Sequence, residues 1–175
     1  MSDRHQFRAK WHDYGEGTYF ITICAHEKRH TFGRIVGTRF FASELGKLIE
    51  ENIRNIPLYY EDVNLLNHVV MPNHLHIVLS IGDQDSVEEH GNIGCLKPPM
   101  HEEECGDYHH NSRLATIIGA FKAGVTREAR TRRIASLPCW QSRYHEHIIR
   151  NRPAYDKIMN YVDCNVENWG SDCFA

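Results

Sequence analysis

The sequence has no apolar run of the ~18 residues that a membrane-spanning helix needs. Its first residues include Arg4, Arg8 and Lys10 but no apolar stretch after them, which argues against a secretory signal peptide. None of the six cysteines belongs to a Cys-x-x-Cys pair, so neither a zinc ribbon nor a thiol redox motif is indicated. These absences predict a cytoplasmic protein.

The chain also lacks the excess of basic residues that is common in nucleic-acid-binding domains, since its formal net charge is -3. The acidic residues are unevenly distributed, and eight of them, against Lys97 alone, fall within residues 83–107. Without that segment the 23 acidic and 20 basic residues of the chain become 15 and 19, a net charge of +4. Residues 83–111 have no hydrophobic periodicity and several Gly and Pro residues. We therefore expect an acidic mobile loop attached to a mildly basic domain.

What is present fits one domain over residues 1–175, with 41% hydrophobic and 25% charged residues. β-Branched and aromatic residues predict strands at 18–24, 63–70, 74–81 and 140–149, with a weaker signal at 33–40. Helical spacing of apolar residues predicts helices after Ser43 and Ser112, and a last helix with Pro153 in its first turn. This order of elements predicts an α+β, ferredoxin-like sandwich, an antiparallel sheet with helices on one face.

Two histidines stand at the start of one predicted strand. Side chains alternate between the faces of a strand, so His74 and His76 should point to one side and Leu75 to the other, into a core. Two neighbouring imidazoles on a sheet can bind a divalent metal ion. A His-x-His pair is common, however, and its spacing alone also fits a purely structural role.

Two polar residues of the last predicted helix complete a chemical set with the histidines. Tyr161 and Asn165 are four residues apart and therefore lie on one side of the helix. Asn165 falls near the centre of the apolar stripe, where a buried amide needs a polar partner or a metal ion. A tyrosine hydroxyl beside a metal-bound phosphate is a nucleophile for phosphoryl transfer.

Several sequence phrases occur in order along the chain: 17–24 (GTYFITIC), 32–33 (FG), 69–76 (VVMPNHLH), 118–122 (IGAFK), 140–150 (WQSRYHEHIIR) and 161–165 (YVDCN). With these phrases the chain resembles the single-tyrosine HUH transposases of small bacterial insertion sequences, including the REP-associated tyrosine transposases. The resemblance implies metal-dependent cleavage and transfer of single-stranded DNA through a covalent 5′-phosphotyrosine. It implies that Tyr161 is the nucleophile and that His74, His76 and Asn165 are the metal ligands. Two imidazoles and an amide oxygen suit Mg²⁺ or Mn²⁺ as the working ion, and Zn²⁺ and Ni²⁺ stay open as ions that bind such ligands more tightly.

Basic residues predict where single-stranded or hairpin DNA would bind. They are interleaved with aromatic residues near the N-terminus, and they recur on the polar faces of the helix after Ser112. The predicted DNA-binding residues are Arg4, Arg8, Lys10, Arg113, Lys122, Arg127 and Arg130.

Alternatives stay open at this point. Tyr144 is a competing nucleophile, and His147 and Arg150 either line the site or shape the end of their strand. A domesticated nucleic-acid-binding protein of the same fold competes with the transposase, whereas a small-molecule hydrolase would have no need of Tyr161. In compact insertion-sequence relatives two chains exchange the tyrosine helix, and in REP-associated relatives a single chain can suffice. We expect a homodimer, because strand transfer at two element ends is easier with two sites.

Overall fold

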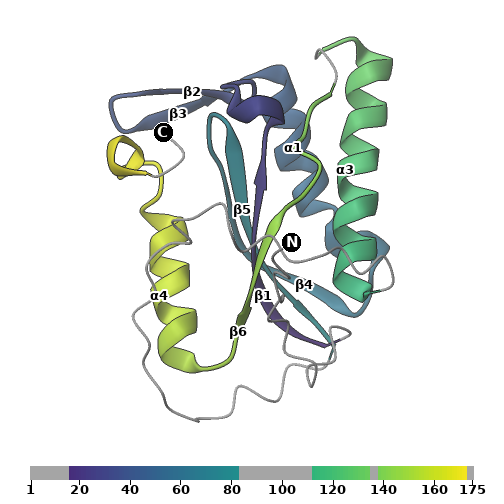
Figure 1. Ribbon diagram of the computed structural model, residues 1–175, viewed down its shortest axis with the longest axis vertical. Coiled ribbons are helices and arrows are strands. Elements are labelled where there is room, and N and C mark those ends of the chain that lie inside the picture. The colour runs from purple at the N-terminus through teal and green to yellow at the C-terminus, as the bar shows by residue number, and fades with distance from the viewer. Residues whose placement is uncertain (1–15, 83–111, 135–137, 173–175) are drawn as a thin grey trace, which may run out of the picture.

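The computed structural model describes residues 16–82, 112–134 and 138–172 (Figure 1). Four strands form an antiparallel sheet in the order β4-β5-β1-β6. These strands are β1 (Gly17–Cys24), β4 (Val63–Val70), β5 (His74–Ile81) and β6 (His145–Ile149). Two shorter strands, β2 (Gly33–Val36) and β3 (Arg39–Ala42), pair with each other as a separate hairpin. The acidic segment predicted at 83–111 lies outside the described residues.

The three predicted helices begin where the sequence signals place them, and a short fourth helix, α2 (Ile56–Tyr59), was not predicted. The others are α1 (Glu44–Arg54), α3 (Arg113–Arg132) and α4 (Arg152–Asp163), with short 3-10 turns η1 (His26–Lys28) and η2 (Trp169–Ser171). Ser43 and Ser112 cap α1 and α3 by accepting a backbone N–H with their side chains, as predicted. Asn151 caps α4 in the same way, and Pro153 lies in its first turn.

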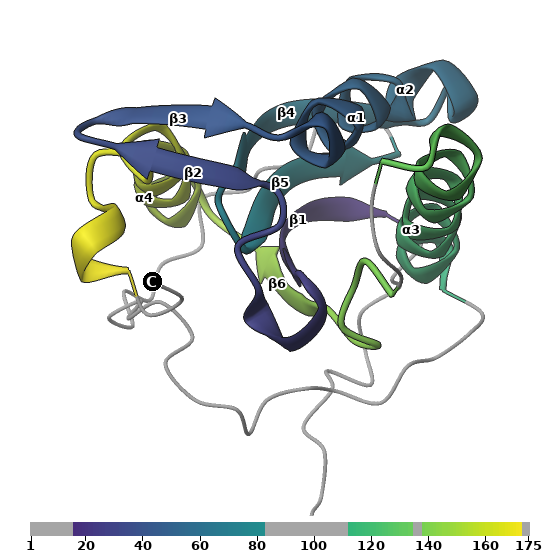
Figure 2. The ribbon, with the colours of Figure 1, turned by 90° about the horizontal axis from the view of Figure 1, so that it is seen from above.

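The sheet has helices on both faces. Helices α1 and α3 pack on one face, where Ile21, Leu75 and Ile77 belong to the larger buried cluster. Helix α4 packs on the other face (Figure 2). Its Ile158 and Val162 belong to a second buried cluster together with residues of the strands. The predicted α+β class and antiparallel sheet are confirmed. The expected placement of helices on one face holds for α1 and α3, while α4 lies opposite them.

The physical reason for this difference is visible in the central strands. Phe20 of β1, Val78 of β5 and Ile149 of β6 are all buried and all point away from α1 and α3. Exposing these apolar side chains to water is unfavourable, so the second face of the sheet also has to be covered. An amphipathic last helix, α4, supplies that cover. None of the described helices is long and apolar enough to cross a membrane.

Candidate active site

The two histidines lie at the start of β5, on the sheet face that α4 covers. Both side chains are fully buried, and their Nε2 atoms are 3.1 Å apart. A tight turn at Pro72 and Asn73 precedes them, closed by the bond from the Met71 N–H to the His74 carbonyl (2.9 Å). The alternation of β5 therefore brings His74 and His76 together on one face, as the sequence predicts.

Each imidazole is held through its Nδ1 atom. The side-chain oxygen of Asn73 lies 2.9 Å from His74 Nδ1, and a carbonyl oxygen only accepts, so Nδ1 donates and Nε2 keeps its lone pair. The hydroxyl of Thr22, directly across from His76 in β1, lies 2.8 Å from His76 Nδ1. Both Nε2 atoms are thereby turned toward each other.

Burial keeps both rings neutral. It lowers the pKa of His74 from 6.5 to about 3. Burial also lowers the pKa of His76 well below its usual value, and the neighbouring His74 adds to this. A neutral imidazole with a free Nε2 lone pair is the form that binds metal ions.

Tyr161 reaches the histidines from α4. Its hydroxyl lies 3.3 Å from His76 Nε2. The ring of Phe20 stacks on His76, with ring centroids 5.0 Å apart, and meets the Tyr161 ring edge-on. Helix α4 packs on the sheet of the same chain, so hydroxyl and imidazole come from one polypeptide.

Asn165 lies just beyond the last residue of α4 and is buried as expected, with 2% of its surface exposed. Its side-chain oxygen Oδ1 has no hydrogen-bond partner among the described residues. Leaving a buried oxygen unpaired is costly, so an electropositive partner would stabilise it.

Asp172 is an acidic residue that the sequence reasoning missed. Its carboxylate lies 3.8 Å from His74 Nε2, and its side chain is 3% exposed. One donor atom each from His74, His76 and Asp172 lie within 4.8 Å of one another, so these residues could hold a metal ion. The nearby Trp169 stacks over His74, with ring centroids 6.0 Å apart. Helical spacing gave no signal for Asp172, because α4 ends at Asp163 and the chain changes direction after it.

The donor set fits a divalent cation. Imidazole nitrogen suits first-row transition metals, while carboxylate and amide oxygens also suit Mg²⁺ and Mn²⁺. The two neutral imidazoles, the unpaired amide oxygen of Asn165 and the Asp172 carboxylate supply both kinds of ligand.

The competing tyrosine lies elsewhere. Tyr144 is buried in the cluster under α1 and α3, on the sheet face opposite the histidines. His147 sits on the α4 face, directly across from Phe20, and is exposed. Arg150 is exposed between β6 and α4.

The described residues that were predicted to bind DNA do not lie beside His74 and His76. Arg4, Arg8 and Lys10 lie outside the described residues. Arg113 forms a two-point ion pair with Asp62, in which its Nε donates over 3.0 Å.

The other predicted DNA contacts lie on α3. The ammonium of Lys122 donates to the carbonyls of Gln141 (2.8 Å) and Ser142 (3.2 Å), and burial lowers its pKa. Arg127 and Arg130 are exposed, but α3 covers the sheet face that points away from His74 and His76. The structure therefore does not bring these residues to the histidine pair, and their DNA contacts stay predictions.

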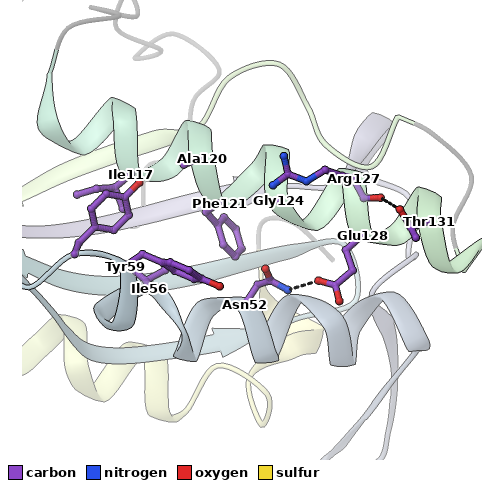
Figure 3. A pocket seen from close by; sticks show the side chains of 11 residues that line it. Asn52, Ile56, Tyr59, Ile117, Ala120, Phe121, Gly124, Arg127, Glu128 and Thr131 are labelled. Carbon is purple, nitrogen blue, oxygen red and sulfur yellow. Dashed lines mark hydrogen bonds between the residues drawn. The ribbon is translucent and has the colours of Figure 1, made fainter.

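A cavity of about 590 Å³ opens between α1, α2 and α3 (Figure 3). Tyr59, Phe121 and Arg127 are among its lining residues, and Asn52 donates to Glu128 across it. It lies on the α1 and α3 side of the sheet, whereas the histidines face α4. The cavity is thus separate from the candidate site.

The chain is similar to proteins found by sequence and to solved structures found by fold. No protein-family model matches the chain. An uncharacterised protein of Haemophilus influenzae (strain KW20 / Rd) is 34% identical over 170 residues, which cover 97% of this chain and 91% of that protein. A REP-associated tyrosine transposase bound to a REP hairpin has a TM-score of 0.59 at 17% identity, with 97% of this chain and 75% of that chain covered. A putative transposase from Deinococcus radiodurans R1 has a TM-score of 0.46 at 12% identity, covering 91% and 95% of the two chains.

Proposed function

The chain belongs to the same protein family as the Haemophilus influenzae relative and has the fold of a REP-associated tyrosine transposase, and we propose that it cleaves and rejoins single-stranded DNA. The observation that carries this proposal is the position of the Tyr161 hydroxyl, 3.3 Å from His76 Nε2 and beside the His74–His76 pair. A nucleophile next to a cluster of potential metal ligands is the arrangement that phosphoryl transfer needs.

In the proposed reaction the hydroxyl oxygen of Tyr161 attacks a DNA phosphorus. The bond between phosphorus and the 3′ oxygen breaks, and that oxygen leaves as a free 3′-OH. The tyrosine hydroxyl loses one proton and the leaving 3′ oxygen gains one, so the protons balance. The DNA stays attached to Tyr161 through its 5′-phosphate. A 3′-OH from another strand can then attack the phosphotyrosine, which restores the tyrosine and joins the two strands.

His74, His76 and Asn165 are the proposed ligands of the metal ion, with the Asp172 carboxylate as a further oxygen ligand. The unpaired oxygen of Asn165 and the short separations within the His74, His76 and Asp172 group support this set. Mg²⁺ or Mn²⁺ is the proposed ion. When bound, it would neutralise charge on the scissile phosphate.

Single-stranded or hairpin DNA is the proposed partner. The similar solved structure is described as bound to a REP hairpin, which supports a DNA hairpin as a substrate here as well. Arg127 and Arg130 stay proposed contacts on α3. Arg113 and Lys122 would have to exchange Asp62 and two backbone carbonyls for phosphates.

End-labelled hairpin DNA with single-stranded flanks tests the proposal. In the presence of Mn²⁺ the wild type should cleave a flank, and EDTA should stop the reaction. His74→Ala and His76→Ala should each abolish cleavage. His68→Ala is the matched control, because His68 is a β4 histidine paired across from Ile77, on the opposite face of the sheet.

The result also separates the two functions left open by the sequence. A folded wild type that binds hairpin DNA but never cleaves it, with either Mg²⁺ or Mn²⁺, would be a binding protein of transposase fold. Cleavage by His74→Ala and His76→Ala at the wild-type rate would remove the metal-site assignment.

A further inference from the structure

The β2–β3 hairpin has an outer face with an unusual composition. Arg34 pairs across from Phe41, and Val36 pairs across from Arg39, so these four side chains share one face of the two-stranded ribbon. All four are exposed, and Val36 (59%) and Phe41 (49%) are apolar residues that lie open to water, as Leu58 and Tyr59 of α2 do elsewhere in the described part of the protein. Phe40, on the inner face, packs against the main core.

Charge and aromatic surface are interleaved on this outer face. Residues 33–42 include two arginines and no acidic residue. In the antiparallel register Arg34 and Arg39 are diagonal neighbours, and residues so placed are about 7–8 Å apart. Phe41 lies across from Arg34, so the ribbon offers a flat ring beside two cationic groups.

The hairpin is rooted beside the candidate site. Phe32, directly before β2, donates its backbone N–H to the carbonyl of Pro72 (3.0 Å), two residues before His74. His30 and His74 both contact the ring of Trp169. From this root the hairpin extends to the side of the molecule that α4 occupies, and α3 lies on the opposite side (Figures 1 and 2).

We propose that the outer face of the β2–β3 hairpin binds the single-stranded DNA that flanks the cleaved phosphate. Arg34 and Arg39 contact backbone phosphates, and a base stacks on Phe41. This inference rests on the proposed function and adds a partner surface to the same site. It also gives the DNA a basic surface at the histidine end of the sheet, which α3 does not offer.

DNA fits this surface better than a second copy of the chain does. A two-fold contact between two hairpins would bring the arginines of one copy against those of the other, with no acidic residue among 33–42 to balance them. A phosphate backbone supplies the negative charge that both arginines need, and bases supply flat surface for Phe41.

Binding of a fluorescein-labelled single-stranded oligonucleotide, measured by anisotropy in EDTA, tests the arginines. Arg34→Gln/Arg39→Gln should weaken binding about tenfold near 0.1 M salt. It should also lower the slope of log affinity against log salt by about 1.4, since each phosphate contact to single strands contributes about 0.7. Arg127→Gln/Arg130→Gln removes the same charge from α3 and should change both quantities less.

Substitution of Phe41 tests the stacking. Phe41→Ser should weaken binding at least about fivefold, since a base stacked on an aromatic ring contributes that much or more. Leu58→Ser removes an exposed apolar side chain from α2, outside the hairpin, and it should leave affinity within about twofold of wild type. Circular dichroism should be the same for all variants.

The proposal is overturned if Arg34→Gln/Arg39→Gln keeps both the affinity and the salt slope of wild type while Arg127→Gln/Arg130→Gln loses them. It is also overturned if wild type sediments as a dimer, and if the hairpin substitutions convert that dimer to monomers without changing the affinity for DNA. If wild type cleaves DNA and Arg34→Gln/Arg39→Gln binds DNA as tightly as wild type, this inference fails and the proposed function stands. Wild type that binds no single-stranded DNA would remove the proposed function with it.

Discussion

The hydroxyl oxygen of Thr22 lies 2.8 Å from Nδ1 of His76, across the pairing of β1 with β5. The hydrogen bond to Asn73 makes His74 Nε2 an acceptor. In the metal-free protein His76 can therefore donate its Nε2–H to His74 Nε2 over 3.1 Å, while its Nδ1 accepts from the Thr22 hydroxyl. For both Nε2 atoms to act as ligands at once, His76 must carry its proton on Nδ1 and donate to Thr22. A hydroxyl both donates and accepts, so Thr22 serves either arrangement.

Thr22→Val should therefore weaken metal binding. Valine fills the same space in a strand but leaves His76 Nδ1–H without an acceptor, and losing such a partner costs about 10- to 100-fold in metal affinity. Isothermal titration with Mn²⁺ measures the loss, and Thr22→Ser should restore most of it. Thr18→Val is the control, because Thr18 lies on the same face of β1 across from Ser80. Equal affinities for Thr22→Val and wild type would show that the hydroxyl does not position His76.

Acid should destabilise the metal-free protein through its buried histidines. The pKa of His74 is about 3 in the folded protein against 6.5 for an ordinary histidine. As pH falls below 6.5, His74 binds a proton in the unfolded chain but stays neutral in the folded protein. The free energy of unfolding therefore decreases until about pH 3. Between about pH 7 and pH 5.5 this amounts to about 1 kcal/mol for one histidine.

Urea unfolding in EDTA measures this effect. His74→Gln lacks the titrating group, so its unfolding free energy should fall by about 1 kcal/mol less than that of wild type over the same pH range. Parallel pH profiles of the two proteins would mean that His74 takes up a proton in the folded state as readily as in the unfolded chain.

Asp172→Asn should lower Mn²⁺ affinity at least about tenfold, because it removes the carboxylate charge 3.8 Å from His74 while keeping the side-chain shape. Glu167→Gln removes an exposed acidic residue from the same segment and should leave the affinity unchanged. Asn165→Ala should also weaken binding. If Asn165→Ala alone weakens it, Asp172 is not a ligand.

One chain carries both Tyr161 and the two histidines, because α4 packs on its own sheet. A mixture of His74→Ala and Tyr161→Phe proteins should therefore recover no cleavage, since neither chain has a whole site. Restored cleavage would require tyrosines exchanged between chains. Sedimentation of the active protein, whose chain mass is 20.4 kDa, tests the expected homodimer separately.

Local sequence signals predicted much of the fold. The predicted strands at 63–70 and 74–81 coincide with β4 and β5, because β-branched runs bounded by a Pro-Asn turn have few other conformations available. The capping roles of Ser43 and Ser112 follow equally from local chemistry. The strand predicted at 140–149 is shorter in the structure, where β6 begins at His145 and Trp140 makes only an isolated bridge with Ala25.

Relationships across the sheet could not be predicted in the same way. The period of a strand shows that His74 and His76 share a face, but it does not say which helix covers that face. The contact of Thr22 with His76 follows from the register of β1 with β5, which the sequence does not give. Asp172 approaches His74 through the path of the chain after α4, which no periodic pattern encodes.

The central claim is that Tyr161 attacks DNA, and the covalent adduct tests it most directly. Wild type incubated with single-stranded hairpin DNA and Mn²⁺ should give a protein–DNA species that survives denaturing electrophoresis and is linked through the 5′-phosphate. Tyr161→Phe should bind Mn²⁺ and DNA but form no adduct, whereas Tyr144→Phe, altered on the opposite face of the sheet, should still form it. An adduct that persists in Tyr161→Phe and disappears in Tyr144→Phe would contradict the account.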